Sequence, residues 1–301
     1  MYLQVLRISH KFLGSHITKL CDQKGIKVNY LTTSKDKIED QPEYKGFYWN
    51  IENREIDENC FKNVDAIIHL AGADIAKRWT SSYKKEIIAS RTQSADLLLE
   101  TLKNSGFKIP RLISASAIGI YPSSMEKLYF EDDKSVDDSF LGEVVELWEA
   151  SADKFKNLGM EVAKIRIGLV LAREGGAFPK LKDPVSFNVG TAFGSGKQWQ
   201  SWVHIEDLAG IFLHVLENKL SGVFNGVAPN PVTNEEMMKE IATQLNKSIW
   251  LPNVPAIALK VALGEMAAVL LSSQLVSSDK IEKAGYEFRY KNLIKALEDL
   301  V

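Results

Sequence analysis

Short apolar runs alternate with helically spaced apolar positions over roughly the first 170 residues of the chain. An uninterrupted apolar run predicts a buried strand, whereas apolar positions that recur every three or four residues predict an amphipathic helix. The predicted strands cover 2–8, 27–32, 46–49, 66–70, 111–116 and 161–170, and the predicted helices cover 14–21, 81–103 and 138–158. Strands that alternate with helices in this way predict an α/β fold with a doubly wound parallel sheet.

The strand predicted at 66–70 is the one around which this sheet is expected to be organised. Its residues are small or β-branched and uninterrupted, which is typical of a strand buried on both faces of a parallel sheet. It ends in His69-Leu-Ala-Gly-Ala73, whose small residues leave room for a flat ligand at the carboxyl end of the sheet. A core strand followed by a turn glycine accounts for the same residues, so this segment alone does not distinguish a ligand-binding strand end from a purely structural one.

The pattern loosens after Leu171. Residues 173–202 are rich in glycine and aromatics, which predicts a long functional loop, because disordered segments contain few aromatic residues. Further elements are a helix at 204–216, a strand at 222–228, a capping box at Thr233-Asn-Glu-Glu236 that opens a helix to about 245, and a short strand at 286–290.

Composition narrows the class of protein. The 301 residues are 45% hydrophobic, and 37 Lys and Arg against 39 Asp and Glu give a net charge of -2 without a basic block, so nucleic acid is not expected as a partner. Cys21 and Cys60 are too few for a disulfide framework and lack metal-ligand spacing, so no metal is expected. The first residues lack an apolar signal core, and Lys260 and Glu265 interrupt the apolar stretch 256–271. We therefore expect a cytoplasmic protein without membrane contact, in which this stretch is a buried or docking helix.

The turn after the first strand tests for a dinucleotide site. Nucleotide-binding units of this kind carry three spaced glycines, for the turn, for the approach of the pyrophosphate and for helix packing. Aligned on Gly14, the other two positions hold Ile8 and Lys11, so the loop is expected to depart from the usual phosphate cradle. Lys11 either blocks the pyrophosphate, binds it through a charge-assisted bond, or is a solvated surface lysine. Lys11, Phe12 and Leu13 are the candidate cofactor residues at this turn.

The end of the second strand bears on the choice of cofactor. It reads Thr32-Thr33-Ser34-Lys35 and has no acidic residue there to hold the two ribose hydroxyls of NAD. Hydroxyls beside Lys35 suit the 2′-phosphate of NADP, although a simple polar turn explains the same sequence. We expect NADPH to bind better than NADH.

Several segments from about residue 65 onward carry a family resemblance. They are His69-Leu-Ala-Gly-Ala73, Arg78-Trp-Thr80, Ser90-Arg91, Ser114-Ala-Ser-Ala117, Phe140-Leu-Gly-Glu-Val144, Trp148-Glu149, Arg166-Ile-Gly168, Gly194-Ser-Gly-Lys-Gln-Trp199, Ser201-Trp-Val-His-Ile205, Ala228-Pro-Asn-Pro-Val-Thr233 and Leu263-Gly-Glu-Met266. With these motifs the chain resembles the sugar-nucleotide-epimerase-like family of atypical short-chain dehydrogenases/reductases, in the NAD-dependent epimerase/dehydratase superfamily. Some members of this family are described as cell-division inhibitors.

The resemblance implies a Rossmann-type fold with NADP as cofactor. Residues 1–170, joined by 203–228, would form the dinucleotide-binding domain, and 171–202 with 229–301 a small C-terminal substrate domain. Matched by position, the implied cofactor contacts are Thr33, Ser34, Leu70, Ala71, Gly72, Ala73, Arg78, Ala115 and Val170. In the glycine-rich segment Lys197, Trp199 and Trp202 are the substrate candidates, with Lys197 either holding a phosphate or lying in a plain surface loop.

The usual catalytic pair of short-chain dehydrogenases is absent. It is a tyrosine whose pKa is lowered by a lysine four residues later, and none of the nine tyrosines here has lysine at that spacing. The atypical group shares this departure. The remaining candidates for proton transfer are Ser116, Tyr121 and Glu143, where burial of the carboxylate would raise its pKa; each also has a purely structural explanation.

Two functions therefore remain open. The first is an NADP-binding epimerase or oxidoreductase that acts on a sugar-nucleotide-like or other small substrate. A homodimer is left open as its assembly. The alternative is a catalytically inactive Rossmann-fold module that binds a nucleotide or a protein partner through the old cleft. The intact strands that end at Gly168 and at His69-Leu-Ala-Gly72 favour a retained pocket and hence the first function, and Ile8 and Lys11 favour the second.

Overall fold

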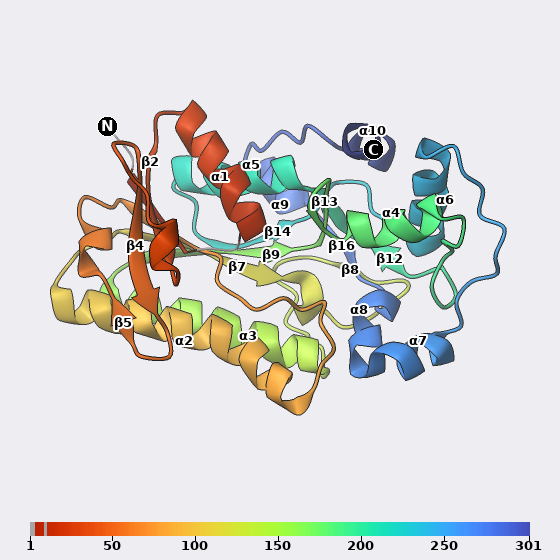
Figure 1. The fold of residues 1–301 in the computed structure, drawn as a ribbon, viewed down its shortest axis with the longest axis horizontal. Coiled ribbons are helices and arrows are strands. Elements are labelled where there is room, and N and C mark those ends of the chain that lie inside the picture. Colours follow the sequence, from red (N-terminus) through yellow and green to blue (C-terminus); the bar gives the residue numbers. More distant parts are fainter. Residues whose placement is uncertain (1–3, 9–10) are drawn as a thin grey trace.

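One large sheet organises the computed structural model, which describes residues 4–8 and 11–301 (Figure 1). Within these residues nine strands run in the order β14–β9–β7–β6–β1–β2–β4–β3, with β5 paired to β4. Their bounds are β1 Gln4–Ile8, β2 Lys27–Thr32, β3 Asp40–Gln41, β4 Tyr44–Asn50, β5 Glu55–Ile56, β6 Ala66–His69, β7 Arg111–Ala117, β9 Glu161–Ile167 and β14 Gly222–Gly226. The pairs from β14 through to β4 are parallel, and β6 lies between β1 and β7. The predicted parallel sheet with a central strand at β6 is confirmed.

Helices cover both faces of this sheet. Helices α1 (Lys11–Gln23) and α5 (Ile205–Glu217) lie on one face, and α2 (Ser81–Ser105) and α3 (Phe140–Asp153) lie on the other (Figure 1). Side chains of β6 alternate between the two cores: Ala66 and Ile68 pack with α1 and α5, and Ile67 packs with α2. This period of two is what a strand buried on both faces requires.

A second core lies beyond the carboxyl end of the sheet. Strands β10 (Leu169–Ala172), β11 (Gly175–Gly176) and β13 (Trp202–His204) form a small sheet, and α4 (Phe178–Ser186), α6 (Asn234–Gln244) and α10 (Leu293–Leu300) pack with it. The shorter elements are β8 Leu128–Tyr129, β12 Trp199–Gln200, β15 Val232–Thr233, β16 Leu275–Val276, α7 Ala256–Leu263, α8 Ala268–Leu271 and α9 Asp279–Lys283. The 3-10 turns are η1 Lys35–Lys37, η2 Glu58–Phe61, η3 Ile118–Ile120, η4 Lys154–Leu158 and η5 Gly264–Ala267. No helix in the described part of the chain has the length and apolarity needed to cross a bilayer.

Three predicted elements are wrong. The single strand at 161–170 is divided between two sheets at Gly168, where a Cβ would lie 2.2 Å from the carbonyl oxygen of Ser201. The segment 173–202 is not one long loop, because it contains α4. The helical stretch 256–271 is broken at Gly264, whose φ is 62°.

The predicted strand at 286–290 is also absent, because its backbone bonds to a buried carboxylate instead of a strand. Asp207, 2% exposed in the first turn of α5, accepts hydrogen bonds from the backbone N–H groups of Arg289 and Tyr290, both at 2.9 Å. It also accepts from the Tyr286 hydroxyl at 3.0 Å. This one side chain therefore holds the C-terminal segment against α5. By contrast, the capping box of Thr233 and Glu236 is confirmed at the start of α6.

Asp207→Ala should lower the free energy of unfolding by about 3 kcal/mol, because it leaves the buried Tyr290 N–H and the half-buried Arg289 N–H unpaired, at about 1–3 kcal/mol for each buried group. Urea unfolding followed by circular dichroism measures the change. Asp22→Ala, which truncates an exposed carboxylate on α1, is the matched control. Equal stability of the two variants would contradict the role given to Asp207.

Candidate functional site

The segment after β6 is held in place by two residues of α2. The backbone N–H of Ala73 donates to the Ser90 hydroxyl at 2.8 Å, and the Arg91 Nη2 donates to the Ala73 carbonyl at 3.2 Å. A Cβ on Gly72 would lie 2.9 Å from the Arg91 Cζ, so a side chain there would displace the guanidinium. Leu70 and Ala71 are buried. The carboxyl end of β6 is therefore a fixed backbone surface without protruding side chains.

Arg91 carries a buried positive charge under this surface. It is 8% exposed, its Nη1 donates to the Ile87 carbonyl at 2.9 Å, and its guanidinium lies 4.8 Å from the centre of the Trp148 ring. Among the described residues it forms no salt bridge, and its Nε has no hydrogen-bond partner. Burial lowers the pKa of Arg91 to about 10, and burial together with the Arg91 charge lowers the pKa of His69 to about 4. The end of the sheet thus carries a positive charge that lies within the electrostatic reach of Asp74 but forms no salt bridge among the described residues.

The end of β2 presents hydroxyls and an ammonium group. Thr33 is exposed, the Ser34 N–H donates to the Thr32 hydroxyl at 3.2 Å, and Lys35 begins η1 with its ammonium 4.9 Å from the centre of the Tyr48 ring. Asp36 follows within η1 and is exposed. Polar groups at this point lie at the edge where parallel sheets bind nucleotides.

The altered glycine turn is only partly within the described residues. Residues 9 and 10 lie outside them, as does the side chain of Lys11, so the predicted shape of this loop stays a prediction. The Phe12 ring packs on Gly175, where a Cβ would lie 3.0 Å from it, and Leu13 is buried in the core between α1 and the sheet. The Leu13 side chain is therefore part of the core, which leaves only its backbone as a predicted cofactor contact.

The other implied cofactor residues differ in exposure. Arg78 is exposed in the segment before α2. Ala115 is buried on β7, and Val170 is half-buried on β10. Their role as cofactor contacts stays a prediction.

Ser116 belongs to a buried ion-pair network. It is 2% exposed, and its hydroxyl donates to the Glu149 Oε1 at 2.7 Å. Arg166 on β9 donates to both oxygens of this carboxylate, from Nε at 2.8 Å and from Nη2 at 3.2 Å. Burial alone would raise the pKa of Glu149, but the hydrogen bonds and charge of Arg166 and the charge of Lys164 outweigh it and lower the pKa below 4.5. Glu149 is therefore a fixed anion at neutral pH.

Tyr121 lies at the other end of the same network. Its hydroxyl accepts from the Arg166 Nη1 at 2.9 Å and donates to the Asn225 Oδ1 at 2.8 Å, and its ring stacks on Tyr129. Burial raises the pKa of Tyr121 to about 12, and Arg166 opposes this rise only in part. Tyr121 is thus positioned as a neutral structural hydroxyl and not as an acid tuned to neutral pH.

Glu143 does not occupy the environment that its predicted role requires. It is exposed in the first turn of α3, so the burial that was expected to raise its pKa is missing. The buried carboxylate of this helix is Glu149, less than two turns further on. The sequence contained a signal for Glu149, because Trp148-Glu149 and Arg166-Ile-Gly168 are both family segments. Neither segment alone shows that Glu149 on a helix pairs with Arg166 on a strand.

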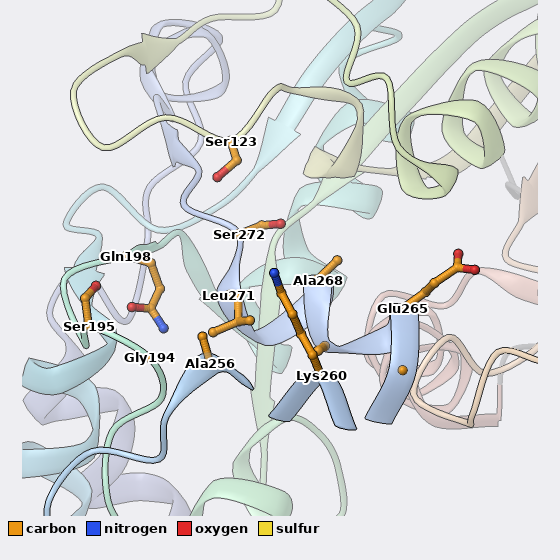
Figure 2. Close-up of a pocket in the computed structure, with 12 residues that line it drawn as sticks. Ser123, Gly194, Ser195, Gln198, Ala256, Lys260, Glu265, Ala268, Leu271 and Ser272 are labelled. Carbon is orange, nitrogen blue, oxygen red and sulfur yellow. The ribbon is translucent and has the colours of Figure 1, made fainter. Parts of the chain in front are cut away.

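A separate set of residues lines a cavity of about 610 Å³ (Figure 2). Its walls come from the loop after β7, the turn before β12, and the segment α7–η5–α8. Among the predicted substrate residues, Trp202 is wrong: it is 0% exposed in the second core, with its Nε1 donating to the Asn230 carbonyl at 2.9 Å. Lys197 is exposed and is not part of the described lining, and Trp199 donates from Nε1 to the Met125 carbonyl. Lys260 and Glu265, which the sequence offered only as breaks in an apolar stretch, line the cavity instead.

The described residues contain no cluster of three or more His, Cys, Asp or Glu side chains placed to hold a metal ion.

The strand order, with small residues at the carboxyl end of β6, defines a Rossmann-type nucleotide-binding fold. The profile of the NAD dependent epimerase/dehydratase family matches residues 10–140, and a domain of unknown function, DUF1731, matches 254–300. An epimerase family protein from Staphylococcus saprophyticus is 37% identical over 290 residues, 96% of both chains. The chain belongs to this NAD(P)-binding epimerase family of short-chain dehydrogenases/reductases.

Two solved structures are similar over the whole chain. The human epimerase family protein SDR39U1 (isoform 2), determined with NADPH, has a TM-score of 0.85 and 28% identity and covers 99% of both chains. The nucleoside-diphosphate sugar epimerase from Corynebacterium glutamicum has a TM-score of 0.79 and 29% identity over 100% of this chain and 58% of its own.

Glu149→Gln should lower the free energy of unfolding by about 3–5 kcal/mol at neutral pH, because it leaves the buried Arg166 charge without its partner. The pKa of Glu149 is lower in the folded chain than in the unfolded one. The advantage of the wild type is therefore full above pH 4.5 and shrinks as the pH falls through the lower folded-state value. Urea unfolding at several pH values measures this difference, with exposed Glu146→Gln as the control. A difference that does not depend on pH would contradict the assignment.

Proposed function

We propose that the chain binds NADP(H) at the carboxyl end of the sheet and transfers hydride to or from a small substrate in the adjoining cavity. The observation that carries this proposal is the fixed surface at Gly72, under which the buried Arg91 forms no salt bridge among the described residues and leaves its Nε without a hydrogen-bond partner. An unpaired buried charge is costly unless it has an electrostatic role, and an anionic cofactor would provide the opposite charge. Support also comes from the similarity to SDR39U1, whose structure was determined with NADPH.

The residues present fit the bound cofactor in two places. Because Gly72 has no side chain, the backbone after β6 lies directly against the Arg91 guanidinium. After β2, Ser34 and Lys35 provide a hydroxyl and an ammonium group. We assign Ser34 and Lys35 to the 2′-phosphate of NADP(H), because a hydroxyl and an ammonium group can both donate charge-assisted hydrogen bonds to a phosphate. Thr33, Ala73, Ala115, Arg78 and Val170 would complete the cofactor contacts.

When bound, NADPH would supply the hydride, and the chain would position the reactants. Ser116 and Tyr121 act as positioning residues, because both hydroxyls are already engaged with Glu149 and with Arg166 and Asn225. The network fixes the end of β7 and the loop that leads from it to the cavity. Residues 1–170 with 203–228 would thus hold the nucleotide, and 171–202 with 229–301 would cover the substrate.

A second function, a non-catalytic NADP(H)-binding module, is favoured by one specific observation. Both predicted proton-transfer hydroxyls are buried and engaged by other side chains, and Glu143 is exposed. Steady-state oxidation of NADPH with a panel of aldehydes and ketones separates the two functions. Turnover supports the oxidoreductase, and tight NADPH binding without turnover supports the module. The cytoplasmic location and the homodimer stay predictions.

Lys35→Glu should weaken NADPH binding at least tenfold, about 1.4 kcal/mol, and leave NADH binding unchanged, because only NADPH carries the 2′-phosphate. Titration followed by the cofactor's fluorescence measures both dissociation constants. Lys62→Glu makes the same charge change on an exposed lysine before β6, at the opposite end of the sheet, and serves as the control. Equal losses for both cofactors would remove Lys35 from the 2′-phosphate site.

A further inference from the structure

The cavity of Figure 2 contains one cationic group that no other side chain pairs. Lys260 is an exposed residue of α7 at the mouth of the cavity, and Figure 2 shows its ammonium directed between Ala268 and Leu271, toward Ser272. Lys260 has no salt bridge among the described residues. The other charged residue of the lining, Glu265, is paired with Lys84 of α2 and is turned away from this point. The inward-facing charge of the cavity is therefore a single positive one.

The remaining walls are apolar or carry hydroxyl groups. Alanines of α7, η5 and α8 and the Leu271 side chain form the apolar part, and Ser123, Ser195 and Ser272 provide hydroxyls. The Gln198 amide is not available to a ligand as a donor, since its Nε2 donates to the carbonyls of Phe193 at 3.0 Å and Leu270 at 3.1 Å. No arginine is among the described residues of this lining.

This distribution of charge is unsuited to a pyrophosphate. A nucleoside diphosphate brings two adjacent negative charges, for which proteins normally provide arginine, several lysines or a helix N-terminus. The described walls offer one ammonium and an apolar surface. They fit a ligand with one negative charge and a hydrocarbon body, because each part meets a complementary wall.

The cavity meets the loop that follows β7 at Ser123. The loop after β7 is fixed to the segment that follows α8: the Gln274 Nε2 donates to the carbonyls of Ile118 at 3.0 Å and Tyr121 at 2.8 Å. The Ser273 N–H also donates to the Ser123 hydroxyl at 3.0 Å. These bonds fix the Ser123 side of the cavity to the segment that follows α8.

We propose that the substrate of this site is a small organic acid, with one carboxylate bound by Lys260 and the neighbouring serine hydroxyls and an apolar body on the alanine and leucine wall. The proposal rests on the proposed function, because it assigns the substrate class of the same site. It excludes a sugar nucleotide as the preferred ligand of this cavity.

Calorimetric titration tests this with three probes, octanoate, octanol and UDP-glucose, each added to the full chain with and without saturating NADPH. We expect octanoate to bind more tightly than octanol and UDP-glucose. Lys260→Met should raise the dissociation constant of octanoate at least tenfold and change that of octanol less than threefold. Lys260→Arg keeps the charge and should retain octanoate binding. Lys295→Met removes an exposed ammonium on α10 and is the matched control. Ala268→Phe, which fills the apolar side of the cavity, should weaken octanoate and octanol alike.

Three results would overturn the proposal: no saturable binding of octanoate, octanoate binding that is the same in Lys260→Met, or UDP-glucose binding that is tighter than octanoate and lost in Lys260→Met. Fluorescence titration of NADPH on the same variants separates this from the cofactor site, because Lys260→Met should leave NADPH affinity unchanged. If the wild type does not bind NADPH, the proposed function fails, and octanoate binding to the cofactor-free chain still decides the assignment of the cavity.

Discussion

The buried ion pair between Arg166 and Glu149 is the interaction on which the site depends. It joins β9 to α3, and through Ser116 and Tyr121 it extends to the end of β7 and to β14. Such a pair adds little stability compared with a well-packed apolar core, because both charges lose their hydration, but breaking it is costly. Its directional hydrogen bonds fix the register of four elements at once. That makes the strand end beside the cavity a rigid platform, which is what positioning of a substrate requires.

Arg91 is the opposite case, because among the described residues this buried charge forms no salt bridge. Its guanidinium supports the backbone at Gly72 and Ala73, and two of its nitrogens are used for carbonyl oxygens. The cost of burying it would be reduced by an anion lying over the same backbone. In the proposed function, Arg91 and the ammonium of Lys35 after β2 serve the dinucleotide, and the ammonium of Lys260 serves a substrate that carries less charge.

The parts of the fold that were predictable from the sequence are those determined by local patterns. The apolar run of β6 and the capping box at Thr233 each depend on neighbouring residues, and both are found. The failures depend on contacts between distant segments. The break at Gly168 follows from a carbonyl 33 positions later in the chain (201 − 168), and the missing C-terminal strand follows from the carboxylate of Asp207. The same limit applies to the site: the end of β6 was predicted, whereas the partner of Ser116 and the inward direction of Lys260 were not, because they arise only when helices and strands have packed.

The central claim is that the carboxyl end of the sheet, and not the cavity under α7, holds the NADP(H). Hydrogen–deuterium exchange of the full chain with and without saturating NADPH tests this most directly, because backbone amides at a bound cofactor lose solvent contact. The account predicts slower exchange in 33–35 and 70–73, with exchange in 256–263 unchanged. Protection confined to 256–263, or no protection at either strand end despite saturation, would contradict it.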